Sequence, residues 1–320
     1  MSQKKKLSNR RSAFIISIAV AVAILSAILI TNIFIPIKYL SAYLNLSTDK
    51  PATGEMRMSC IDVGDGECTL IEFPDGKVAL FDGGNGSYNS QLKIFKKLNA
   101  SKINKIDYLF CASSSARLCG GLAEIVKYKE IGEIFAPVYK NTGVTDAYRN
   151  FINQARKKNK TINECRYGAG AYSEEYGYYF CVLYPPKSVP GSVDNINSSA
   201  IWISYGGTNV LLLGDLSSSE LIDLSDAYAI GGFEINGRKI VLEDCNVVKL
   251  PSGMENDIAF NRLCDLISPE TAILSTNVGS APSAVTNDVN YLYDYVYRTS
   301  IDGTVTLSIS GGNYEVKKER

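Results

Sequence analysis

The sequence contains no histidine among its 320 residues, and it has a single tryptophan. Without an imidazole, the chain cannot form a Ser-His-Asp or Cys-His arrangement for nucleophile activation, and it has no histidine general base. Zinc and iron sites built on histidine ligands are excluded for the same reason. Any catalysis must therefore rely on carboxylates, lysine, tyrosine, cysteine or a bound cofactor.

Charged residues are absent from residues 12–37, although five basic residues precede this stretch. The stretch is longer than the roughly 20 apolar residues that cross a bilayer, and longer than the apolar region of a cleavable signal peptide. We therefore predict a basic cytoplasmic tail over residues 1–11, an uncleaved transmembrane helix over 12–37 and a linker over 38–56. The positive-inside rule places the N-terminus in the cytoplasm and residues 57–320 outside the membrane, in a single-pass arrangement.

A basic character is missing from the part of the chain predicted to lie outside. Six of the 33 basic residues and none of the 33 acidic residues fall in the first 40 positions, which leaves 27 basic against 33 acidic, a formal net charge of −6. Non-specific nucleic-acid binding usually requires a basic surface, so the net charge argues against nucleic acid as a partner, although a local groove is still compatible with it. The basic run over residues 156–160 fits the solvated end of a helix.

The chain has eight cysteines but no CxxC pair and no dense disulfide framework. Most of them lie in apolar runs, where buried thiols behave as small hydrophobic groups. The disulfide state is left open by the sequence.

The chain as a whole has the composition of a folded protein, with 46% hydrophobic and 21% charged residues. Strands are predicted at 57–63, 67–73, 77–82, 106–111, 134–136, 178–184, 200–205, 209–213, 247–250, 271–275, 304–309 and 314–316. Helices are predicted at 90–99, 120–127, 146–157, 217–225, 255–266 and 288–297. Two β-rich halves, each followed by helices, indicate an α/β domain over 57–320 with two packed sheets and helices outside.

Several motifs occur in the order found in one family. Asp62-Val63-Gly64-Asp65-Gly66 and Phe81-Asp82-Gly83-Gly84 are followed by Gly120-Gly121-Leu122 and by Leu213-Gly214-Asp215, and the chain ends with a Tyr-Arg-Thr…Asp-Gly-Thr-Val segment. In order and spacing they resemble the extracytoplasmic metallo-β-lactamase-like domain of ComEC-type competence proteins. The resemblance spans about residues 57–317 and implies an αββα sandwich.

The metal ligands of that family are absent from the matching positions. Its T-H-x-D-x-D-H ligand run aligns with residues 112–118, and its HHGS motif aligns near Ser252. The resemblance implies zinc or manganese, but a catalytic zinc takes three protein ligands and arginine brings a fixed positive charge. We therefore predict no metal and no other cofactor. The predicted vestigial metal-site pocket consists of Ser113, Ser115, Arg117, Leu118, Asp215 and Ser252.

The turns of the motifs are interpreted as structural rather than catalytic, because an aspartate beside glycines commonly stabilises a tight turn. These turn residues are Asp62, Gly64, Asp82, Gly83, Gly84, Gly120 and Gly121.

The pattern favours a membrane-anchored pseudoenzyme that acts as a binding or scaffolding module outside the cell, with a protein partner that the sequence does not name. One alternative is a metal-dependent hydrolase, of phosphodiesterase or nuclease type, with a site rebuilt from Cys111, Cys119, Cys245 and Asp215. Another is an accessory protein that handles DNA during uptake. A serine nucleophile in the run 113–115 is disfavoured, because no histidine can activate it.

Overall fold

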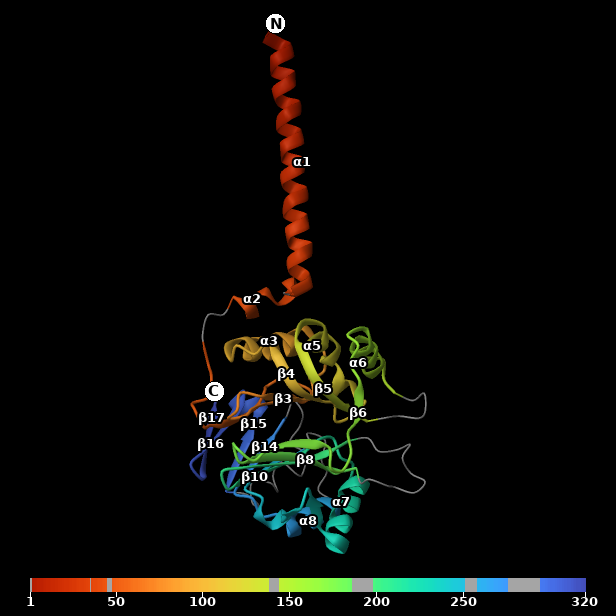
Figure 1. Ribbon diagram of the computed structural model, residues 1–320, viewed down its shortest axis with the longest axis vertical. Coiled ribbons are helices and arrows are strands. Elements are labelled where there is room, and N and C mark those ends of the chain that lie inside the picture. The colour runs from red at the N-terminus through yellow and green to blue at the C-terminus, as the bar shows by residue number, and fades with distance from the viewer. Residues whose placement is uncertain are drawn as a thin grey trace.

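The computed structural model describes residues 2–34, 36–44, 48–137, 144–185, 198–250, 258–275 and 294–320, and it contains two stacked sheets with helices on both outer faces (Figure 1). The first sheet begins with a hairpin, as the turn signals predict, and is completed by the end of the chain. In spatial order its strands are β17 (Asn313–Lys318), β16 (Val305–Ser310), β1 (Met56–Cys60), β2 (Thr69–Glu72), β3 (Val78–Phe81), β4 (Lys105–Phe110), β5 (Glu130–Ala136) and β6 (Ile162–Glu164).

The second sheet is built from the middle of the chain and combines antiparallel with parallel pairing. In spatial order its strands are β15 (Tyr295–Arg298), β14 (Thr271–Leu274), β13 (Val247–Leu250), β10 (Thr208–Leu213), β9 (Ala200–Tyr205), β8 (Tyr178–Tyr184) and β7 (Gly170–Ser173). A separate hairpin consists of β11 (Phe233–Ile235) and β12 (Arg238–Ile240).

Aromatic side chains fill much of the space between the sheets. Phe81, Phe110 and Phe135 lie opposite one another on β3, β4 and β5, and their rings stack with centroid separations of 4.7 and 4.6 Å. Phe180 of β8 meets Phe110 edge-on at 5.7 Å from the other sheet. Such pairs add specific geometry to the apolar burial that holds two sheets together.

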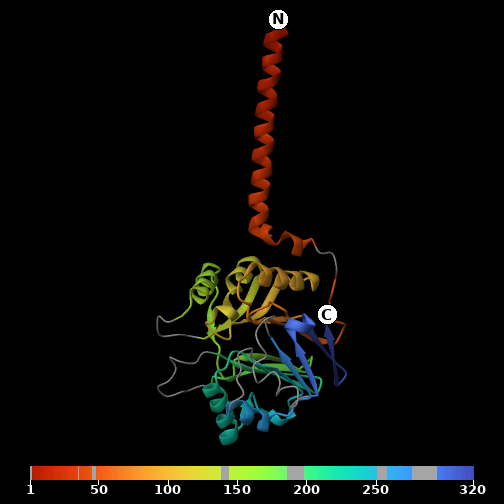
Figure 2. The same cartoon turned by 180° about the vertical axis from the view of Figure 1, so that it is seen from behind.

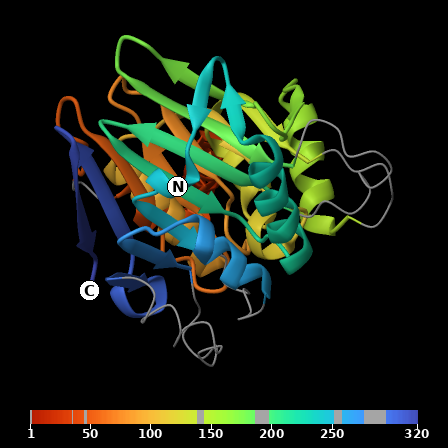
Figure 3. The same cartoon turned by 90° about the horizontal axis from the view of Figure 1, so that it is seen from below.

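Helices cover the outer faces, as the two-sheet prediction requires. α3 (Tyr88–Ala100), α5 (Leu122–Tyr128) and α6 (Asp146–Lys157) pack on the first sheet. α7 (Ser218–Gly231), α8 (Ile258–Leu266) and the β11–β12 hairpin lie on the second, as the view from below shows (Figure 3). Short helical turns complete the described elements: η1 (Ile37–Tyr39), α2 (Leu40–Tyr43), α4 (Ala116–Cys119), η3 (Leu242–Asp244) and α10 (Thr299–Asp302).

Part of one predicted helix is wrong. The prediction over 288–297 falls partly outside the described residues, and its last part forms β15, which pairs in parallel with β14. Tyr295, Val296 and Tyr297 have side chains that favour a β-strand. The edge of β14 provides hydrogen-bond partners for their backbone, and the spacing of apolar residues along the chain does not predict this pairing. The predictions also missed β6, β7, β11 and β12, which are short and partly exposed.

The N-terminal helix α1 (Ser2–Phe34) extends away from the sandwich (Figures 1 and 2). The side chains of residues 14–30 are exposed. Among the described residues, no helix combines the length and apolar character of a membrane span, so the structure does not support the predicted transmembrane helix.

The segment predicted as a linker packs on the sandwich in part. Tyr39 is 1% exposed, and its ring lies 5.1 Å from Phe95 and 5.6 Å from Tyr88 of α3. Lys38 pairs with Glu124 of α5. Side-chain contacts therefore attach η1, which follows α1 in the chain, to α3 and α5.

Candidate functional site

The candidate site lies where several strands end at one edge of the sandwich. β3 and β4 are parallel, as are β10 and β13, so their carboxyl ends share an edge of each sheet. Asp82 follows β3, the loop over 112–118 follows β4, Asp215 follows β10, and Lys249 belongs to β13. The β1–β2 loop adds Glu67 to the same place.

A buried ion pair forms the interior of the site. The Lys249 ammonium pairs with the Glu67 carboxylate, and their side chains are 2% and 5% exposed. A buried pair of this kind requires both partners, because either charge alone would be costly to desolvate. The lysine therefore places a basic side chain between the two sheets.

Asp82 lies in the same interior and has a strongly perturbed carboxyl group. Its Oδ1 accepts a hydrogen bond from the Ala112 backbone N–H at 2.8 Å, and its backbone is left-handed, with φ of 61°. Burial, together with the negative charges of Glu67 and Asp215, raises the pKa of Asp82 to about 8, although the Ala112 hydrogen bond and Lys249 oppose the shift. Asp82 is thus largely protonated at neutral pH.

The cavity at this point is small. It measures about 20 Å³ and is lined by Glu67, Asp82 and Lys249 together with two hydroxyl-bearing residues and several apolar ones. One water molecule requires roughly 10–15 Å³ of such volume. The interior can hold a single water, but it leaves no room for a substrate beside the ion pair.

A second cation lies at the outer end of the site. The Arg117 Nε donates to Asp65 Oδ1 at 2.8 Å, and its Nη1 lies 3.8 Å from Asp215 Oδ1. The Asp215 backbone N–H donates to the buried Ser198 Oγ at 2.6 Å, which positions the turn after β10. Arg117 therefore bridges two carboxylates from different loops.

The other predicted pocket residues have separate environments. Ser113 is buried and its Oγ accepts from the Ser115 backbone N–H at 3.1 Å, so the two serines stabilise their own turn. Leu118 is fully buried, and its carbonyl accepts from the Gly83 N–H at 2.7 Å. The structure brings Arg117 and Asp215 together, whereas Ser252 lies outside the described residues.

Glycines allow the loops of the site to touch. A Cβ on Gly121 would lie 1.6 Å from Gln91 Nε2 and 2.3 Å from the Gly83 carbonyl oxygen. Gly84 has φ of 66° and donates its N–H to the Glu67 carbonyl at 2.8 Å. The turn that contains Asp62 and Gly64 is closed by a 3.2 Å bond from the Gly64 N–H to Asp62 Oδ1. Gly120 contacts the backbone of Asn85 in the same cluster of loops.

The described cysteines do not form a thiolate site. Cys60, Cys68, Cys111, Cys119, Cys165, Cys181 and Cys245 are free and buried. Burial raises the pKa of Cys245 to about 12 and the pKa of Cys111 well above its ordinary value. Metal binding requires the deprotonated thiolate, which these environments disfavour.

The described residues do not fit a catalytic metal. Among the described residues, no three Asp, Glu or Cys side chains converge as ligands. The carboxylates that approach one another already face protein cations, Glu67 with Lys249 and Asp215 with Arg117. A divalent cation introduced here would meet the repulsion of both.

Sequence reasoning did not assign Glu67 or Lys249 to the site. Glu67 directly follows the Asp62–Gly66 motif, and Lys249 interrupts an apolar strand, Val247-Val248-Lys249-Leu250. A lysine in a fully buried strand requires a buried counter-charge, and this was the available signal.

Comparisons with solved structures show likeness at the level of fold. No family model matches the sequence, and no curated protein matches it. CmlA, a diiron β-hydroxylase from Streptomyces venezuelae, superposes with a TM-score of 0.48 at 12% identity, over 82% of this chain and 55% of CmlA. The metallo-β-lactamase fold protein YhfI from Bacillus subtilis gives 0.44 at 10%, over 82% and 99%. Yeast PDE1 gives 0.47 at 9%, over 76% and 97%.

These structures include the metallo-β-lactamase-fold protein YhfI. At such low identities and TM-scores they carry no argument about the chemistry of this site. The ComEC-type resemblance stays a prediction from the sequence motifs.

Proposed function

We propose that this protein is a membrane-anchored, catalytically inactive relative of metallo-β-lactamase-fold enzymes, of the ComEC type, which acts as a binding or scaffolding module outside the cell. The single observation that carries the proposal is the Lys249–Glu67 pair buried beside Asp82. The Lys249 ammonium group neutralises the Glu67 carboxylate, which would otherwise attract a metal cation. Arg117 does the same for Asp65 and Asp215 at the outer end.

Metal analysis tests the loss of the metal site. The full chain, purified in detergent without an affinity tag, is expected to contain less than stoichiometric zinc, manganese or iron by elemental analysis. It is also expected to show no hydrolysis of bis-p-nitrophenyl phosphate above buffer when these metals are added. Stoichiometric metal together with turnover would overturn the proposal.

A rebuilt hydrolase site receives no comparable support. It would require thiolates near Asp215, whereas Cys111 and Cys245 are buried and their raised pKa values favour the thiol. If turnover were found, its loss in Cys119→Ser and Asp215→Asn variants would establish this alternative.

The anchoring part of the proposal rests on the apolar surface of residues 14–30. The exposed side chains over residues 14–30 are uncharged and mostly apolar, including Phe14 and Leu29 at 67% and 63% exposed. A lipid environment would cover this apolar surface, which is unfavourable in water. Membranes from cells that produce the full chain are expected to retain it after alkaline carbonate extraction. Release into the carbonate supernatant would contradict anchoring.

A further inference from the structure

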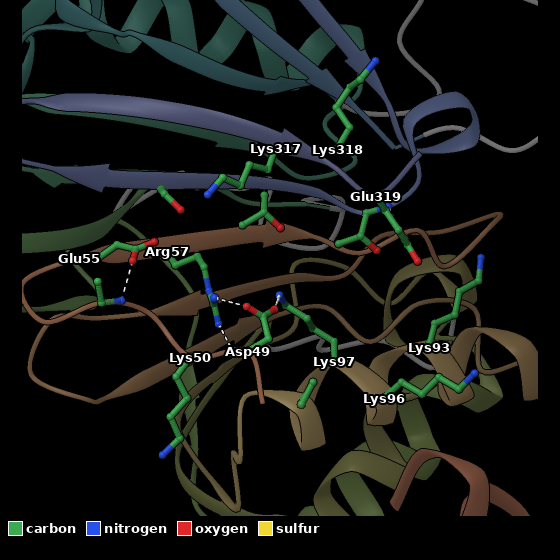
Figure 4. Close-up of a pocket in the computed structure, with 15 residues that line it drawn as sticks. Asp49, Lys50, Glu55, Arg57, Lys93, Lys96, Lys97, Lys317, Lys318 and Glu319 are labelled. Carbon is green, nitrogen blue, oxygen red and sulfur yellow. Dashed lines mark hydrogen bonds and ion pairs between the residues drawn. The ribbon is translucent and has the colours of Figure 1, made fainter. Parts of the chain in front are cut away.

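A groove lined by basic side chains lies at one side of the first sheet, away from the Glu67–Lys249 site and without any residue in common with it. Its volume is about 680 Å³. The groove lies between α3, the chain that leads into β1, and the C-terminal hairpin (Figure 4). Its charged and hydroxyl-bearing lining residues are Asp49, Lys50, Glu55, Arg57, Lys93, Lys96, Lys97, Thr304, Thr306, Ser308, Lys317, Lys318 and Glu319.

Three separate elements bring the cations together. Lys93, Lys96 and Lys97 are three and four positions apart on α3, so they share one face of that helix. Lys317 and Lys318 belong to β17, across the groove from them (Figure 4). The fold thus gathers charges that are more than 200 positions apart in the sequence.

Hydroxyl groups lie along β16, one of the strands that line the groove. Thr306 and Ser308 are alternate residues of β16, and Thr304 immediately precedes that strand, so all three side chains point to the same face. Hydroxyls can donate to an anion or accept from a neighbour. They add directional donors to a site whose lysines act mainly as point charges.

The lining has an excess of positive charge. It contains seven Lys or Arg side chains against three carboxylates, whereas residues 41–320 as a whole are net acidic. Among the described residues, Lys50 and Lys96 have no carboxylate partner. Both are exposed and extend away from Asp49 at the rim (Figure 4).

The remaining cations differ in how firmly they are held. Arg57 is buried and bound by Glu72 and Asp49, so it belongs to the wall. Lys93 and Lys318 pair with Asp62 and Asp302, which lie outside the lining, through side chains that are 45% and 49% exposed. The partner carboxylates are only 11% and 10% exposed, so only the lysine end of each pair is open to solvent. Lys93 and Lys318 nevertheless line the groove and add to its positive charge.

We propose that this groove binds a phosphate-bearing anion. A phosphate group offers several oxygens to lysines that approach from different elements, and it suits the hydroxyls of β16. The first residue in the chain that lines the groove, Asp49, follows α2 by a few positions, and α2 lies between α1 and the sandwich (Figures 1 and 2). The headgroup of an anionic lipid and a soluble phosphate ester share this chemistry. The lipid source rests on the proposed anchoring, whereas the groove itself does not depend on the loss of the metal site.

Two ligands distinguish the sources, with the full chain in detergent as the sample. Calorimetric titration with sn-glycerol 3-phosphate measures binding of a soluble ester. Native mass spectrometry with phosphatidylglycerol and phosphatidylcholine measures preference for an anionic headgroup. The Lys50→Gln/Lys96→Gln double variant is expected to bind about tenfold more weakly, because two surface charge contacts are lost. Raised salt is expected to weaken binding further.

The Lys157→Gln/Lys158→Gln double variant is the matched control, because it removes the same charge from exposed positions at the end of α6. The proposal is supported if the unmodified protein binds either ligand, the groove variant binds it more weakly and the control variant binds it as well as the unmodified protein. The ligand that shows this pattern identifies whether the anion is a lipid headgroup or a soluble phosphate ester. Absence of binding to both ligands at low salt, or equal binding by both variants, would overturn it. Metal content of the same sample tests the proposed function separately.

Discussion

At the scale of single residues, the site is determined by which cation faces its carboxylates. Lys249 and Glu67 are 182 positions apart, and each is tolerated in the interior because the other is present. Arg117 links Asp65 to Asp215 in a more exposed setting, with its side chain 34% exposed. The residues that define the site chemically are therefore two basic side chains, neither of which can ligate a metal.

Replacing the buried lysine tests this arrangement. Lys249→Met removes the counter-charge of Glu67 and is expected to lower the free energy of unfolding by about 3–5 kcal/mol. The double variant Lys249→Met/Glu67→Gln removes both charges and is expected to recover most of that loss. Urea unfolding of the full chain in detergent measures both. Equal stability of the single and double variants would show that the pair is not coupled.

Asp82 predicts a pH dependence with a defined sign. Its folded-state pKa of about 8 lies above its ordinary value of 3.8, so the folded protein binds the extra proton between these values. The contribution of this proton to the free energy of unfolding is fully present at low pH. It is lost as the pH rises through about 8, at up to about 1.4 kcal/mol per pH unit. Glu67 and Asp215 favour the protonated form, and Lys249 opposes it.

Asp82→Asn carries no titratable group, and its amide oxygen can still accept from Ala112. Its unfolding free energy is expected to decline less than that of the unmodified protein between pH about 5 and 8. Parallel curves for the two proteins would mean that Asp82 is ionised throughout that range.

At the scale of elements, close contact between loops explains why glycines recur in the motifs. The β3–α3 and α4–α5 turns approach so closely that Gly121 contacts Gln91 and the Gly83 carbonyl, and Gln91 Nε2 donates to that same carbonyl at 2.9 Å. The sequence identified these turns, but their mutual contact depends on how α3 and α5 pack on the sheet.

Gly121→Ala would place a methyl group in that contact. The expected destabilisation is about 1–3 kcal/mol, typical of overpacking. Gly231→Ala, at the end of α7, is the control, because no atom lies within 4 Å of the added Cβ. It is expected to be neutral or slightly stabilising. Thermal unfolding compares the two, and an equal effect would contradict the packing argument.

At the scale of the whole molecule, the C-terminal hairpin makes the first sheet continuous with the start of the sandwich. β16 pairs with β1 over five residues, and Leu307, opposite Met58, is fully buried between the sheets. The groove beside α3 also depends on this hairpin, because β17 supplies one of its walls. The prediction of two successive β-rich halves therefore did not include the pairing of β16 with β1, which completes the first sheet.

Leu307→Ala is expected to destabilise the protein by about 2–5 kcal/mol, because it leaves a cavity in the central core. Glu315→Ala on β17 changes a side chain that is 71% exposed, and it should have little effect. Chemical unfolding of both variants checks this difference. A loss no larger for Leu307→Ala than for Glu315→Ala would show that the hairpin contributes little to the core.

The sequence by itself determined the elements whose signal is local. The helix over 146–157 and the strands over 178–184, 200–205 and 247–250 were predicted with the observed bounds, because side-chain periodicity and nearby turn residues define them. It also determined that no imidazole chemistry is possible. These properties depend on composition and on neighbours along the chain.

Only the tertiary structure decided which distant groups meet. It pairs β15 with β14, closes the first sheet with β16 and β17, and places Lys249 beside Glu67. The free energy of a strand edge or a buried charge depends on the partner that faces it, and partners far apart in sequence are selected by packing. The absence of histidine excluded one kind of metal site, and the fold then placed protein cations among the carboxylates that remained.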